Sequence, residues 1–189
     1  MSQTPRDRWA IPPKIGYVNA AQNAHFVAAP LLAAAAIGIA GVMAADGDKF
    51  RWPGPAMTLM TVCAVFFVSC IQSSFNAATH LFNPADLDAW YGSSEKPPDT
   101  VLMQIQQRDF QIWKQSSRRA VRLYNWGVVT LGMGTATALA PHESASSAHA
   151  ACRWAACAFV VVATVRVAVT TTAEARRVRR NRHSRRQEP

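Results

Sequence analysis

The residues of this chain that could bind a metal or attack a substrate follow no catalytic motif. Side chains of the metal-ligand type lie close together in the sequence at His142, Glu143, His149 and Cys152, and their spacing matches no zinc motif. The four cysteines form no CxxC pair, so we expect them to be reduced, buried, small apolar residues. No phosphate-binding loop, nucleophile elbow or dinucleotide fingerprint is present. We therefore predict a protein that is not an enzyme and that needs no metal or cofactor.

The polar side chains inside long apolar runs are more informative. One group, here called the polar stripe, recurs at steps of three and four residues and comprises Gln72, Ser73, Asn76 and His80. Arg166 interrupts another apolar run. A guanidinium in lipid is costly and has five donors, so we expect Arg166 to face protein and to hydrogen-bond to the polar stripe. We prefer a structural clasp between two helices. The alternatives are a solute or ion pathway, and snorkelling of Arg166 alone.

The apolar runs define the fold class. The 189 residues contain four long stretches that are almost free of charge, which excludes an ordinary soluble domain. We predict an all-α integral membrane protein, a bundle of four transmembrane helices at about 25–45, 56–80, 123–141 and 151–172. The first run is longer than the core of a signal peptide, so we expect a retained helix, with Pro30 in its first turns.

Lysine and arginine placement predicts the orientation. Sixteen of the 20 lie before the first run, between the second and third, or after the fourth. Positive flanks stay on the cytoplasmic side of a membrane. We therefore expect a plasma-membrane protein with both termini in the cytoplasm, where the leader 1–24, the central segment 81–122 and the basic tail 173–189 also lie.

The central segment predicts two helices. Asn83 is a good N-cap, Pro84 suits the first helical position, and Gly92 ends the first helix. A second, amphipathic helix should begin at Asp99 or Thr100 and can continue into the third span. Its apolar side would carry Leu102, Ile105, Ile112 and Trp113.

Basic residues next to the third and fourth spans predict a cytoplasmic surface that meets anionic lipid headgroups. Simple positive flanking of a span explains the same residues and is the safer interpretation. No aromatic residues are interleaved with them in the tail, so we do not expect nucleic-acid binding. The residues are Arg118, Arg119, Arg122, Arg176, Arg177, Arg179 and Arg180.

Function is predicted only by class. We expect the membrane component of a larger bacterial assembly, such as a secretion, plasmid-transfer or stress and defence system, that binds a protein partner through its basic cytoplasmic face. The alternative is a small oligomeric channel or pore-forming effector built around the polar stripe and Arg166. Small residues at four-residue steps, such as Gly134 and Ala138, favour close helix packing within the bundle or in a homo-oligomer.

The topology can be tested with reporter tags. Tags at the N-terminus and at the C-terminus should both be cytoplasmic, because both flanks are basic, and a tag inserted near Gly47 should be external. Accessibility of each tag in intact and in permeabilised cells measures this. Termini on opposite sides of the membrane would rule out four spans.

Overall fold

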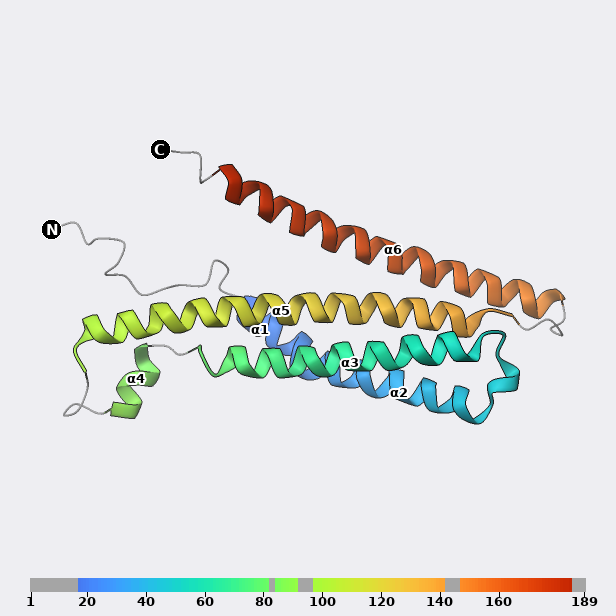
Figure 1. Cartoon of the computed structure of the whole chain (residues 1–189), viewed down its shortest axis with the longest axis horizontal. Helices are drawn as coiled ribbons and strands as arrows, with labels where there is room; N and C mark the ends of the chain where they lie inside the picture. The colour runs from blue at the N-terminus through green and yellow to red at the C-terminus, as the bar shows by residue number, and fades with distance from the viewer. Residues whose placement is uncertain (1–16, 82–83, 92–96, 142–146, 185–189) are drawn as a thin grey trace. The chain divides into compact units, whose positions relative to one another are not determined.

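The computed structural model describes residues 17–81, 84–91, 97–141 and 147–184. Within these ranges the chain is helical and contains no strand, which confirms the all-α class (Figure 1). Among the same residues, three helices are long and apolar enough to cross a membrane, namely Val18–Ala45, Pro53–Ala78 and Ser147–Ala173. The chain divides into two compact units. The first comprises Met1–Pro30 and Ser69–Arg122, and the second comprises Leu31–Val68 and Leu123–Pro189.

The first apolar run begins earlier than predicted. Helix α1 (Tyr17–Asn23) leads through a π-helical turn, η2 (Ala24–Ala28), into α2 (Ala29–Ala45) without a break. The last residues of the predicted leader are therefore helical, and Pro30 is an interior residue. Proline clashes with the carbonyl four residues before it, and a π turn is one way to relieve that clash. Here the Ala29 N–H donates to the Ala24 carbonyl, five residues back.

The helices of the second apolar run and of the start of the central segment agree with the predictions from the sequence. A 3-10 turn, η3 (Gly47–Lys49), precedes α3 (Pro53–Ala78), whose two prolines lie in its first turn, where a missing donor costs least. Helix α4 (Pro84–Tyr91) begins and ends where the proline and Gly92 predicted, while its expected N-cap, Asn83, lies outside the described residues.

Helix α5 (Asp99–Leu139) is a single helix of 41 residues, so the predicted amphipathic helix does run into the third apolar run. No glycine or proline interrupts it before Gly127. The third run, 123–141, is not among the three most apolar helices because it includes an asparagine and several threonines and glycines. Helix α6 (Ser147–Ser184) extends past the predicted end of the fourth span, since arginine is a good helix former.

The core of the first unit forms along one stripe of α5. Its buried residues recur at helical spacing and are Leu102, Gln106, Phe110, Trp113, Ser117 and Ala120. Phe110 and Trp113 stack at 5.0 Å and pack with Ala77 of α3. Of the residues predicted on the apolar side of this helix, Leu102 and Trp113 are buried, whereas the side chain of Ile105 is 46% exposed. Two polar residues, Gln106 and Ser117, lie on the buried stripe instead, which hydrophobicity alone could not locate.

The core of the second unit depends on close approach of helix backbones. The ring of Phe67 on α3 lies against Gly127 of α5, where an added Cβ would come within 2.8 Å of it, and it meets Tyr124 edge-on at 5.7 Å. The Cys63 thiol donates to the Gly127 carbonyl at 3.4 Å. Farther along α5, Gly134 packs against Met60. The small residues of α5 thus serve packing within the chain.

Gly127→Ala should lower the stability of the folded protein by roughly 1–3 kcal/mol, because the new methyl group overlaps the buried Phe67 ring. Gly38→Ala on α2 is the matched control. Nothing lies within 4 Å of its added Cβ, so the change should be neutral or stabilising by up to about 1 kcal/mol. Thermal unfolding in detergent compares the two. Equal effects of both substitutions would contradict the close contact.

Candidate functional site

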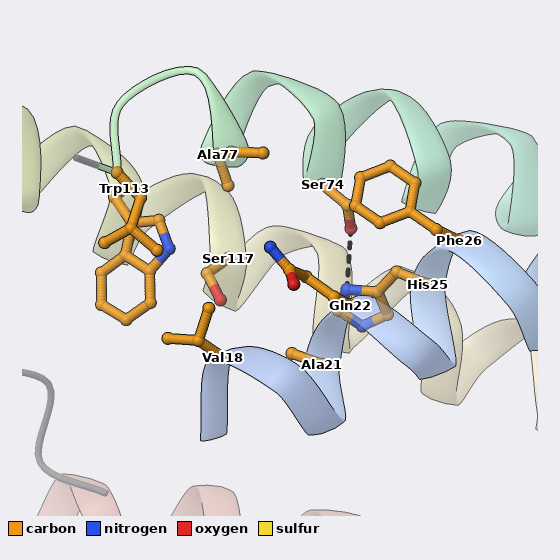
Figure 2. A pocket seen from close by; sticks show the side chains of 11 residues that line it. Val18, Ala21, Gln22, His25, Phe26, Ser74, Ala77, Trp113 and Ser117 are labelled. Carbon is orange, nitrogen blue, oxygen red and sulfur yellow. Dashed lines mark hydrogen bonds between the residues drawn. The ribbon is translucent and has the colours of Figure 1, made fainter. Parts of the chain in front are cut away.

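The best-defined polar contact of the first unit joins the π turn to α3. Ser74 Oγ and His25 Nδ1 lie 2.7 Å apart, and both residues are only 5% exposed. Figure 2 shows the hydroxyl directed at the ring from the facing helix. Which atom donates depends on the imidazole tautomer. A buried polar group costs free energy unless it is hydrogen-bonded, so this pair fixes how the two elements meet.

A small cavity adjoins this pair. Gln22 from α1, Ser117 from α5 and the edge of Trp113 lie around it together with His25 and Ser74 (Figure 2). About 30 Å³ of it is open to the centre of a water molecule. That is room for roughly one or two waters, and the polar side chains could bind them. The cavity is too small for a substrate or cofactor of ordinary size.

Two residues of the polar stripe contact α5. Asn76 Nδ2 donates to Ser116 Oγ at 3.4 Å, and His80 Nδ1 lies 3.7 Å from the Asp109 carboxylate, with both side chains of that pair largely shielded. These two contacts and the His25 pair join α3 to its neighbours in the first unit through polar groups. Asn76 and His80 therefore link α3 to α5.

The other two members of the stripe make no such link. Ser73 Oγ donates to the Ser69 carbonyl of its own helix at 2.8 Å, and Gln72 is exposed. Arg166 belongs to the second unit, where it is exposed on α6 one helical turn from exposed Val162 and Val169. The clasp between Arg166 and the stripe stays a prediction.

The predicted basic surface is described in part. Arg118, Arg119 and Arg122 are exposed on α5, and Arg122 Nε donates to the Arg118 carbonyl at 3.4 Å. The backbone of α6 passes through the four tail arginines, 176, 177, 179 and 180, but their side chains lie outside the described part. The α5 arginines follow one another closely enough to form a basic patch near the middle of the helix, on its exposed side.

The sequence analysis missed the buried polar residues. On α3 five of the buried residues are spaced by four, three, four and three, and Ser74 is the polar member of that series, which is Cys63, Phe67, Cys70, Ser74 and Ala77. A serine at a core position of an amphipathic pattern was the available signal. His25 had none, because the π turn that brings it to Ser74 changes the helical spacing.

The cysteines and the residues of the metal-ligand type form no shared site in the described part of the chain. All four cysteines, at positions 63, 70, 152 and 157, are free, and the last of them donates to the Ala136 carbonyl at 3.4 Å. Cys63 and Cys70 are buried as predicted, whereas Cys152 is exposed. No group of three metal-ligating side chains occurs among the described residues, and His142 and Glu143 lie outside them.

No protein-family model, no curated protein and no solved structure matches the chain. Function has to be argued from the residues themselves.

Ser74→Ala should lower the stability by about 1 kcal/mol, because it removes the buried hydroxyl that lies 2.7 Å from His25 Nδ1. Ser73→Ala is the control, since that hydroxyl bonds only within its own helix and its loss should cost less than about 0.5 kcal/mol. The free energies of unfolding of Ser74→Ala, of His25→Leu and of the double variant give the coupling energy between the two side chains. Strict additivity of Ser74→Ala and His25→Leu would contradict a direct bond.

Proposed function

We propose that this protein is a non-enzymatic, four-span membrane protein of the bacterial plasma membrane, that its termini and the segment holding α4 lie in the cytoplasm, and that it binds a protein partner there. The observation that carries the proposal is α5, which continues as one helix from the apolar region of the chain into the polar central segment. In this proposal α5 carries the docking surface and joins it to the apolar region of the chain.

The exposed side of α5 supports a docking role. Seven residues at steps of four and three form one stripe, here called the docking stripe: Val101, Ile105, Arg108, Ile112, Gln115, Arg119 and Arg122. All are exposed except Ile112, which is half-buried. Such a stripe is apolar at one end and basic at the other. Its spacing fits a second helix laid along it in the manner of helix-in-groove recognition.

The chemistry of the stripe favours one kind of partner. Exposed Val101 and Ile105 offer apolar contact, and three arginines offer charge-assisted hydrogen bonds to carboxylates. The complementary surface is an amphipathic helix with aliphatic residues at one end and Asp or Glu at the other. Charge complementarity of this kind mainly sets specificity and association rate.

A pore built on the polar stripe has less support. Conduction needs polar side chains directed at a continuous wet path. Asn76 and His80 instead contact single residues of α5, and the adjoining cavity has room for about one or two waters. A structural and docking role accounts for these contacts with nothing further assumed.

Site-specific photo-crosslinking in native membranes tests the proposal. A photoreactive residue at Ile105 should give a discrete crosslinked protein, whereas the same residue at Val65, an exposed position on the apolar helix α3, should not. The double change Arg119→Glu and Arg122→Glu should reduce the product about tenfold by reversing the charge that attracts an acidic partner. Identical patterns at positions 105 and 65 would contradict a docking stripe.

A further inference from the structure

The second unit contains a much larger pocket than the first. Residues from α2, α3, α5 and α6 and from the connection after η3 line it, and about 440 Å³ is open to the centre of a water molecule. Its apolar lining includes Ile39, Phe50, Met60 and Leu139. A pocket of this volume is in the range that binds a small molecule or an extended alkyl chain.

The same pocket carries a fixed cation. Arg153, which is half-buried, donates from Nε to the Leu139 carbonyl at 3.0 Å and from Nη2 to the Ala138 carbonyl at 3.2 Å. These bonds hold the guanidinium at the C-terminal end of α5, where a cation is favourable. Carbonyls carry only partial charge, so the full positive charge persists, and further N–H groups of the guanidinium can donate to an anion.

His149 adds a second polar group to the lining. It precedes Arg153 by four residues on α6 and therefore lies on the same side of that helix. Its side chain is exposed. The pocket thus combines an apolar wall with a neighbouring arginine and histidine, which is the arrangement that an amphiphile with an anionic head requires.

We propose that this pocket binds an anionic phospholipid, with an acyl chain along the apolar lining and the phosphate at Arg153 and His149. Helices α2, α3 and α6 supply part of the lining, and each belongs to a segment apolar and long enough to cross a membrane, so acyl chains would surround it. The guanidinium selects for negative charge in the headgroup. An apolar wall offers little to the polar backbone of a peptide, which disfavours a protein segment as occupant.

The experiment is a lipid titration followed by native mass spectrometry of the full-length protein in detergent. The probes are dioleoylphosphatidylglycerol and dioleoylphosphatidylcholine, which share their acyl chains and differ in headgroup charge. One phosphatidylglycerol should bind about tenfold more tightly than phosphatidylcholine, because the choline cation of phosphatidylcholine offsets the attraction between its phosphate and Arg153. Equal binding of the two lipids, or no stoichiometric lipid adduct, overturns the proposal.

Three variants locate the site. Arg153→Gln should abolish the preference for phosphatidylglycerol, and because it also removes donors to α5, His149→Glu provides a second test at an exposed position and should reduce the preference severalfold. Lys49→Gln, which removes an exposed cation of the same unit outside the pocket lining, is the control and should leave the preference unchanged. The proposal fails if His149→Glu binds phosphatidylglycerol as the unaltered protein does, or if Lys49→Gln has the larger effect. A dimer whose contact excludes lipid from the pocket would also overturn it.

Discussion

Backbone hydrogen bonding is the constraint on which the rest of this structure depends. A peptide group left unpaired in lipid costs several kcal/mol, so apolar runs of this length have to be helices. Once the backbone is satisfied within each helix, neighbouring helices are free to meet through side chains alone. Hydrophobic burial contributes little between helices in lipid, so contact has to come from close packing or from polar pairs.

The second unit shows close helix packing, and the first unit shows polar pairs between helices. In the second unit, Gly127 admits the ring of Phe67, and the Cys63 thiol reaches a backbone carbonyl beside it. In the first unit, α3 meets its neighbours through His25 with Ser74, through Asn76 with Ser116, and through His80 with Asp109. Close packing tolerates little change of shape, whereas polar pairs specify which residues must face one another.

Sequence reasoning succeeded where a local signal decides the structure. Pro84 and Gly92 marked α4, and Asp99 marked the start of α5, because capping chemistry acts over a few residues. It failed at Pro30, which looked like a helix start and is an interior residue after a π turn. Hydrophobicity also could not reveal that Gln106 and Ser117 of α5 are buried while Ile105 is exposed. Spacing along the chain suggested a partner for Arg166 but could not determine it, because the partner depends on tertiary structure.

The π turn has a consequence for how this segment tolerates length changes. A π turn holds one residue more than an α-helical turn, so it behaves as an insertion absorbed within a helix. Loss of one residue from Ala24–Ala28 would let the segment relax to a regular α-helix while α1 keeps nearly the same rotation about its axis relative to the residues that follow. Relaxation to an α-helix without a deletion would instead turn α1 by about 100° and move Val18 and Gln22 out of the cavity together. A single-residue deletion in this stretch that keeps His25 should therefore be tolerated better than one within α2, where the helix holds no extra residue.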